Sequence, residues 1–237
     1  HSSAVAPQSS GNGSDISRNG RQLSGLEGGQ SSTGTAGSGA AGDLTVNCES
    51  VLVSGQVEQG RSGLFASAIF GDGEGGNLTV DTQQLQVLEG GTLSVSNFSS
   101  SPNSPVPSGR GGAGDLTVDA RQILLSNDAI LNADTAMGDR GNITLTTETL
   151  TLRNGSRIST NAPGPSTGGN NNINSASAVI VPPDAENSHI TANAEFGYGP
   201  HCNIVARCVL RLPPNTALPQ QPVNTPTSVL TLALEPT

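Results

Sequence analysis

The chain has 237 residues and a formal net charge of −9, and its ten basic residues are all Arg and form no cluster. The charge argues against a nucleic-acid-binding face, which needs a basic stripe, and against an electrostatic membrane anchor. Apolar residues make up 33% and aromatic residues 2% of the chain, so a thick conventional core is excluded, and either disorder or a thin, repeated core remains.

The N-terminal part holds one incomplete repeat between two segments of simple composition. Residues 1–13 are predicted to be disordered, and their first ten lack the charged-then-apolar order of a signal peptide. Residues 18–24 match residues 153–159, so the repeat region is expected to begin near residue 14. Residues 25–41 are almost wholly Gly, Ser, Thr, Ala and Gln, which is typical of a flexible loop between coils.

A five-residue phrase recurs from residue 42 onward: Gly, then Asp or Asn, then Leu or Ile, then Thr, then Val or Leu. It occurs at residues 42–46, 76–80, 114–118 and 141–145, and a degenerate copy starts at residue 169. The starts are separated by 34, 38, 27 and 28 residues. We expect this irregularity to come from Gly/Ser/Pro-rich loops of variable length between the units, of which residues 99–114 are one.

Each unit is predicted to contain three short strands. In the second unit these carry Leu78 and Val80, then Leu85 and Val87, and then Leu93, each alternating with polar residues. Equivalent positions carry the same residue type in successive units, as expected for like strands stacked in register about 4.8 Å apart. The sequence therefore predicts an all-β fold, a right-handed parallel β-helix (solenoid) of about five to six irregular coils. An antiparallel meander and disorder are the alternatives.

The repeat region is predicted to span residues 14–199, and beyond it the pattern loses register. Residues 200–237 are expected to form an irregular tail, because six Pro residues lie between positions 213 and 236. Within this tail the apolar run 229–234 is expected either to pair on a sheet edge or to make no contact.

The phrases at 141–145 and 150–160, together with residues 187–194, resemble the repeats of filamentous-haemagglutinin-like exoproteins of the two-partner secretion type. The resemblance covers roughly residues 14–199 and rests on structural motifs. It implies a β-helical shaft fragment, export through an outer-membrane two-partner transporter, and a secreted or cell-surface location. The Asn-Pro-Asn signature of the family's secretion domain is absent, since the chain has no Asn-Pro dipeptide.

The favoured function is that of a structural or adhesive segment of a bacterial exoprotein, without catalytic residues. The family brings none to carry over. A glycan or a matrix protein is the candidate ligand, held by long loops such as 97–113 and 161–172 on the rigid column. A passive spacer is an alternative, and both versions predict neither a cofactor nor a membrane span, since no apolar run reaches ~20 residues.

A polysaccharide-degrading enzyme or lyase fragment is the main alternative from another class. Glycosidases usually need two acidic groups across a cleft, and sugar clefts favour aromatic platforms, of which this chain has few. Most acidic candidates fall in turns or at corners, where Asp serves turn geometry. The acidic candidates are Asp72, Glu74, Asp115, Asp119, Asp128, Asp134 and Asp139.

Two segments have residues of the metal-ligand type. Residues 71–78 resemble a calcium-binding Gly/Asp nonapeptide, but that motif works in tandem and here has one copy. His201, Cys202 and Cys208 supply three ligand types without an evident fourth. No metal site is predicted. The sequence does not fix the state of Cys48, and Cys202 and Cys208 are either free or paired with each other.

A Thr column suggests ice binding as a further alternative. Thr45, Thr79, Thr117 and Thr144 would stack in register, but a second Thr column is expected to be missing. Five Asn-x-Ser/Thr sequences arise largely from the repeat phrase, and no modification is assigned to them. They start at Asn12, Asn77, Asn97, Asn142 and Asn154.

Overall fold

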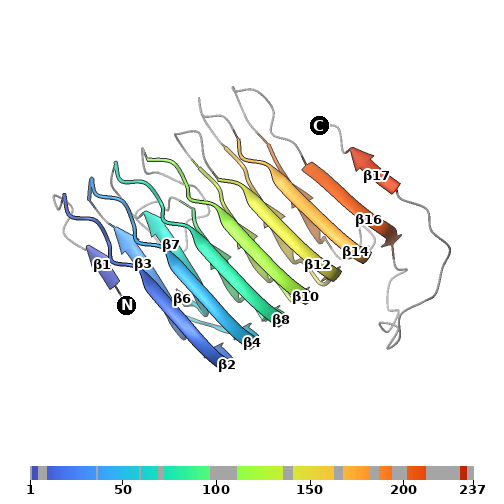
Figure 1. Cartoon of the computed structure of the whole chain (residues 1–237), viewed down its shortest axis with the longest axis horizontal. Coiled ribbons are helices and arrows are strands. Elements are labelled where there is room, and N and C mark those ends of the chain that lie inside the picture. Colours follow the sequence, from blue (N-terminus) through green and yellow to red (C-terminus); the bar gives the residue numbers. More distant parts are fainter. Residues whose placement is uncertain are drawn as a thin grey trace.

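The computed structural model of the chain is an all-β column of stacked parallel strands (Figure 1). The structure describes residues 2–4, 10–35, 37–58, 60–68, 72–96, 111–135, 141–162, 168–181, 187–193, 202–211 and 230–233. Every assigned element in this part of the chain is a strand. The prediction of a β-solenoid with about five to six coils is confirmed.

Long strands form a sheet with the order β17-β16-β14-β12-β10-β8-β4-β2. All of them except β17 run parallel, and like residues pair between neighbouring coils: Leu78 lies beside Leu116, and Thr79 beside Thr117. The parallel strands are β2 (Ile16–Leu26), β4 (Leu44–Ser54), β8 (Leu78–Leu88), β10 (Leu116–Ser126), β12 (Ile143–Leu152), β14 (Asn171–Val181) and β16 (Cys202–Arg211).

Short strands form a second parallel sheet, with the order β1-β3-β7-β9-β11-β13-β15. Each short strand after β1 follows a long one along the chain, so one long and one short strand make one coil. The members are β1 (Ser2–Ala4), β3 (Gln30–Thr35), β7 (Gly63–Ala68), β9 (Thr92–Ser94), β11 (Ile130–Asn132), β13 (Arg157–Ser159) and β15 (His189–Thr191).

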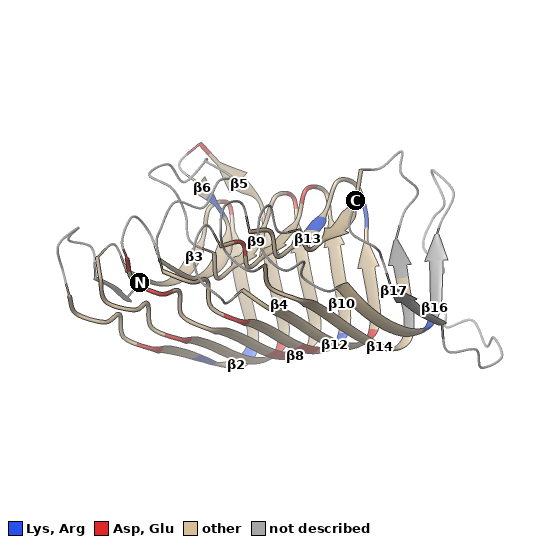
Figure 2. Cartoon of the chain, turned by 90° about the horizontal axis from the view of Figure 1, so that it is seen from above, with Lys and Arg blue, Asp and Glu red and all other residues tan. Residues whose placement is uncertain are grey.

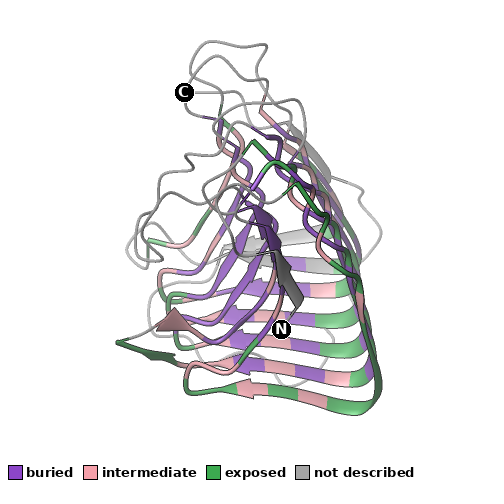
Figure 3. Ribbon diagram, turned by 90° about the vertical axis from the view of Figure 1, so that its left-hand side faces the viewer, coloured by how far each residue is buried: buried purple, intermediate pink, exposed green. Residues whose placement is uncertain are grey.

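The long strands are bent, which gives the column three sides. In β8 the inward positions are Leu78, Val80 and Thr82, and after two exposed residues they resume at Leu85 and Val87. This break in the period-two alternation turns the chain through a corner. The first and second predicted strands of each unit are therefore one bent strand. We call its two halves the first and second faces, and the short strands the third face. Figure 3 views the stacked coils obliquely from the N-terminal end.

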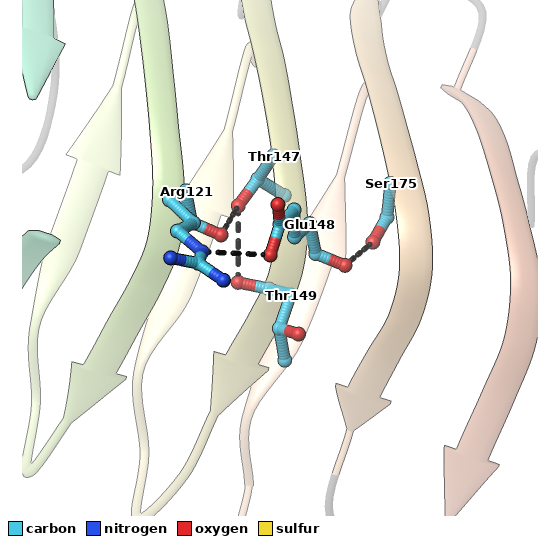
Figure 4. Close-up of polar contacts among 5 residues, drawn as sticks. All are labelled: Arg121, Thr147, Glu148, Thr149 and Ser175. Atoms are coloured by element: carbon cyan, nitrogen blue, oxygen red, sulfur yellow. Dashed lines mark hydrogen bonds and ion pairs between the residues drawn. The ribbon is translucent and has the colours of Figure 1, made fainter. Parts of the chain in front are cut away.

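Hydroxyl side chains support the bend between the first and second faces (Figure 4). Thr147 Oγ1 lies 3.1 Å from the carbonyl oxygens of both Arg121 and Thr149, and Ser175 Oγ donates to the carbonyl of Glu148 at 2.8 Å. Carbonyl groups that the bend removes from the regular ladder thus keep a donor. Outside the bend, the exposed Arg121 and Glu148 side chains form an ion pair with a 3.0 Å N–O distance.

The interior is a stack of apolar columns with few large side chains. Leu44, Leu78, Leu116 and Ile143 form one column and are fully buried, and Leu93 and Leu131 close the interior from the third face. Each fully buried Leu contributes roughly 1.5–3 kcal/mol relative to an exposed one. Because the interior is only one residue deep, this low-aromatic composition suffices to fill it.

Glycine begins the repeat phrase because successive coils approach one another there. A Cβ on Gly76 would lie 2.0 Å from the Gly42 carbonyl oxygen, and one on Gly114 would lie 1.9 Å from that of Gly76. Gly169 meets Gly141 in the same way, at 2.1 Å. Any larger residue would push the coils apart, so the column requires Gly at this corner.

The structure corrects the predicted boundaries at both ends. Residues 25–41 are not a continuous flexible loop, because Gln30–Thr35 forms β3 and pairs with β7. Residues 1–13 are not wholly disordered, since β1 pairs with β3. Residues 200–237 are not wholly irregular, because β16 adds one more long strand. These strands were missed because sequence patterns reveal strands by their apolar side chains. Backbone hydrogen bonds to a neighbouring strand do not require such side chains.

The apolar run near the C-terminus pairs on an edge, as one of the two expectations had it. β17 (Leu230–Ala233) lies antiparallel to β16, with Asn203 opposite Ala233. It pairs only with the first-face half of β16, from Asn203 to Ala206. An added antiparallel strand covers backbone groups that a sheet edge otherwise exposes.

One irregular interval has a different cause from the one expected. Between Ser54 and Gly63 the chain forms a hairpin of β5 (Gln56–Val57) and β6 (Gly60–Arg61), where the next coil has only the turn 89–91. This insertion, and not a Gly/Ser/Pro loop, lengthens the 34-residue interval. Figure 2 shows the hairpin projecting from the column.

Candidate functional site

A ladder of Asp and Asn side chains runs along the corner where each long strand begins. Each side-chain oxygen accepts a hydrogen bond from the backbone N–H of the equivalent residue in the next coil, at 2.8–3.2 Å. The ladder consists of Asp15, Asp43, Asn77, Asp115, Asn142 and Asn170. The second residue of the repeat phrase thus has a structural role, and Asp115 belongs to this ladder.

A second ladder lies at the turn between the second and third faces. Glu89, Asn127 and Asn154 have positive φ angles of 51°, 56° and 51°. Asn154 Nδ2 donates to Asn127 Oδ1 at 2.7 Å, and Asn127 Nδ2 donates to Glu89 Oε1. Asp128 follows in the same turn with φ 61°. Asp128 therefore serves turn geometry, as the sequence predicted for acidic residues at corners.

The remaining acidic candidates do not converge on one cleft in the described part of the chain. Asp119 is exposed on the first face beside Asp81 of the neighbouring coil. Asp72 and Glu74 are exposed in the segment before β8, and Asp139 lies outside the described residues. Charged positions are distributed along the column (Figure 2).

Asp134 is half-buried, and its carboxyl group accepts hydrogen bonds from the neighbouring coil. It lies just after β11, facing outward from the third face, where Ala133 faces inward. Asn161 N donates to Asp134 Oδ1 at 2.7 Å, and Ser159 Oγ donates to Oδ2 at 3.1 Å. Burial raises the pKa of Asp134, and the hydrogen bonds from Asn161 and Ser159 oppose this shift.

Neighbouring side chains complete a polar cluster around this carboxyl group. Asn132 Nδ2 lies 3.5 Å from Asp134 Oδ2, and Asn132 itself is only 8% exposed. Asn132 pairs with Ser159 across the sheet, so the cluster bridges two coils. Within the described residues, the side-chain oxygens of Asn132 and Asn161 are buried without a hydrogen-bond partner. We name Asn132, Asp134, Ser159 and Asn161 the third-face oxygen cluster.

The sequence singled out Asp134 but not the residues around it. Asn132, Ser159 and Asn161 fall in three-residue strands and in the residues that follow them, where no repeated phrase draws attention. The two-residue spacing in Asn132-Ala133-Asp134 and Ser159-Thr160-Asn161 is the signal that was available, because alternate residues share one face.

Arg61 of the hairpin reaches across neighbouring coils on the turn side of the third face. Its guanidinium donates to the carbonyl oxygen of Gly90 at 2.9 Å and to that of Asp128 at 3.5 Å. Burial lowers the pKa of Arg61, and the positive charge of Arg157 acts in the same direction. The hairpin is thereby fixed to the turn ladder. Its tip carries Val57, which is 41% exposed.

The predicted Thr column is present on the first face, and a second Thr column does not accompany it. Thr45, Thr79 and Thr117 stack in register and are exposed, and Thr144 continues the column. The adjacent outward column has Asn, Asp and Thr members, namely Asn19, Asn47, Asp81, Asp119, Thr146 and Asn174. The Thr-x-Thr surface that ice binding would use is therefore not formed over these coils.

The calcium-like segment follows the general corner design. A Cβ on Gly73 would lie 2.1 Å from the Gly39 carbonyl oxygen, and Asn77 belongs to the corner ladder. Gly39 begins the equivalent segment 39–42 of the preceding coil, Gly-Ala-Ala-Gly, which has no acidic residue. Tight coil stacking thus explains the glycines, and Gly71 lies outside the described residues.

Cys202 forms no disulfide with another described residue. Cys48 is buried and free, and Cys202 is half-buried and free, with a pKa raised by burial. Cys202 and Cys208 lie on one strand, β16, and His201 lies outside the described residues. Over the described ranges, no group of three or more His, Cys, Asp or Glu side chains could hold a metal ion.

Three of the Asn-x-Ser/Thr sequences belong to the ladders. Asn77 and Asn142 lie in the corner ladder and Asn154 in the turn ladder. Asn12 is exposed, and Asn97 lies outside the described residues. The two loops expected to carry binding, 97–113 and 161–172, are described only at residues 111–113, 161–162 and 168–172.

Comparisons of the chain with protein-family models, with curated proteins and with solved structures gave no match. None of the described residues forms a helix that is long and apolar enough to cross a membrane. The chain is a parallel β-solenoid compatible with a β-helical shaft.

Proposed function

We propose that the chain is a non-catalytic structural and adhesive segment of a secreted or cell-surface bacterial exoprotein, similar to filamentous-haemagglutinin-like shafts. The carrying observation is the in-register stacking of like residues over successive coils, with side-chain ladders at two of the corners. Such a column is rigid along its axis because each coil is bonded to its neighbours through both backbone and side chains.

Binding would come from chain segments that the column displays side by side. The connections from the third face to the next long strand follow equivalent positions, since Ser96, Asp134 and Asn161 align in successive coils. The connections after Ser96 and Ala162 contain residues 97–113 and 163–172. Loops held on a rigid scaffold are where binding residues concentrate. The candidate ligands are a glycan or a matrix protein, and export would use an outer-membrane two-partner transporter.

A binding screen with one loop variant tests this proposal. The purified chain is presented to immobilised glycans and matrix proteins, alongside a variant in which residues 97–110 are replaced by the shorter sequence 136–140. Saturable binding to one ligand class, lost in this variant, is the expected result. A second variant replaces residues 163–167 by 136–140, which preserves length and leaves the first loop intact. Loss of binding in this variant instead of the first would place the ligand on the second loop.

Two outcomes would contradict the proposal in different ways. The absence of binding across the panel would leave the column as a spacer, the passive version of the same structural role. Release of reducing ends or unsaturated products from any polysaccharide would overturn the non-catalytic assignment. Asp134→Asn would then identify whether this half-buried carboxyl group takes part in the reaction.

A further inference from the structure

Two acceptors of the third-face oxygen cluster have no donor. Asp134 accepts hydrogen bonds from Asn161 N, Ser159 Oγ and, at 3.5 Å, Asn132 Nδ2, whereas the buried side-chain oxygens of Asn132 and Asn161 have no partner within the described residues. A buried acceptor without a donor costs roughly 1–3 kcal/mol. Asn132 and Asn161 both bond to Asp134, through a side-chain and a backbone nitrogen respectively. Their two unpartnered oxygens therefore indicate a missing positive group near this carboxyl group.

The donor set suits a hard divalent cation. A carboxylate, two carboxamide oxygens and a hydroxyl are the ligands that Ca²⁺ takes, at 2.3–2.6 Å and with variable geometry. Mg²⁺ demands near-ideal octahedral geometry and retains its waters. These residues come from two adjacent coils about 4.8 Å apart, so one ion could bridge the coils.

The spacings fit this chemistry. Two oxygens that each lie about 2.4 Å from one ion are roughly 3.4 Å apart when they subtend a right angle. Asp134 Oδ2 lies 3.1 Å from Ser159 Oγ and 3.5 Å from the Asn132 amide. A half-turn of that amide exchanges its nitrogen for its unpartnered oxygen without moving the rest of the side chain.

We propose that Asn132, Asp134, Ser159 and Asn161 form a Ca²⁺ site that ties two successive coils of the third face. It is distinct from the Gly/Asp segment 71–78, and it does not rest on the adhesive function. With one carboxylate the site is weak, in the range of about 10⁻⁴–10⁻³ M that extracellular modules show. The partial burial of Asp134 supports the site, since a bound cation offsets the cost of burying a charge.

Arg157 gives the proposal a second, opposite handle. Its positive charge interacts with the negative charge of the Asp134 carboxylate. The same charge repels a cation bound at Asp134. Arg157→Gln should therefore strengthen Ca²⁺ binding several-fold, whereas variants of the ligands weaken it. A site elsewhere on the column would not show this pair of opposite effects.

Equilibrium dialysis of the full chain against radioactive Ca²⁺, after treatment with a chelator, tests the site. We expect saturable binding of one ion per chain that an equal concentration of Mg²⁺ does not displace. Asp134→Asn and Asn132→Leu should each lose at least tenfold in affinity. Asp119→Asn is the matched control, because it removes an exposed carboxylate from the first face and should leave binding unchanged.

Several results would overturn the site. If no saturable binding is seen up to about 10 mM Ca²⁺, tenfold above the weak end of the expected range, the chain has no calcium site. Loss of binding in Asp119→Asn with retention in Asp134→Asn would place the ion on the open first face. Circular dichroism of each variant confirms that the column is folded. If Asp134→Asn does not fold, unchanged affinity in Arg157→Gln alone contradicts the proposal.

Discussion

The first and third faces of the column share parallel backbone pairing but differ in how far their outward-pointing residues are buried. On the first face apolar residues point inward and polar residues such as Thr117 and Asp119 point to solvent. On the third face residues that point outward are buried as well, among them Ser94 and Asn132. Regular alternation of apolar and polar residues builds the column. On the third face this alternation does not separate buried from exposed residues, so buried polar groups there need hydrogen-bond partners.

Adjacent residues of β10 should show this division most strongly. Leu116→Ala removes a fully buried side chain from a continuous column and should cost about 2–5 kcal/mol of unfolding free energy. Thr117→Ala, on the exposed side of the same strand, should stay within about 0.5 kcal/mol of the wild type. Urea unfolding followed by circular dichroism measures both, and similar costs would contradict the assignment of the faces.

The corner ladder should come next in effect. Asn142 donates through Nδ2 to Asp115 at 3.0 Å and accepts at Oδ1 from the backbone of Asn170 at 2.9 Å. Asn142→Leu loses both bonds and should destabilise the column by about 1–3 kcal/mol. Asn142→Asp keeps the acceptor and serves as the control. Equal unfolding free energies for the two variants would show that the ladder does not stabilise the column.

The pH dependence of the unfolding free energy tests the raised pKa of Asp134. The pKa of Asp134 is raised by burial, so its favourable contribution is present below the ordinary pKa of about 4 and is lost as pH rises through the folded value. In buffer with a chelator, Asp134→Asn should therefore gain stability relative to wild type as the pH rises from acid to neutral. Urea midpoints at several pH values measure this, and a constant difference would contradict it.

The smallest effect is expected at the bend. Arg121 and Glu148 form an ion pair, but their side chains are 62% and 52% exposed. Arg121→Ala should change the unfolding free energy by less than about 1 kcal/mol, and added salt should reduce even that. Thr147→Val, at the same bend, removes the hydroxyl near two carbonyl groups and should cost more. The opposite ranking would mean that the ion pair, and not the hydroxyl, holds the bend.

Particular residues show how far the sequence led. The phrase at 114–118 correctly predicted the alternation of Leu116 and Val118, the stacking of like strands, and a turn or corner role for Asp115. The sequence pattern did not reveal β3, because its Ser and Thr residues carry no apolar signal. It did not reveal the hairpin either, because residues 56–61 have no repeated counterpart. Asp134 was named as a candidate, but its partners were not, because Ser159 and Asn161 belong to the next coil.

The sequence by itself determined the positions of the repeated apolar strands, the Gly and Asn corners and the repetition, since alternation and turn preference are local properties of a few consecutive residues. The tertiary structure alone decided the fusion of two strands into one bent strand, the fixing of the hairpin by Arg61, and the hydrogen bonds that Asp134 accepts from the next coil. These depend on which residues lie one strand spacing away, about 4.8 Å across the coils, although 25 or more positions separate them along the chain.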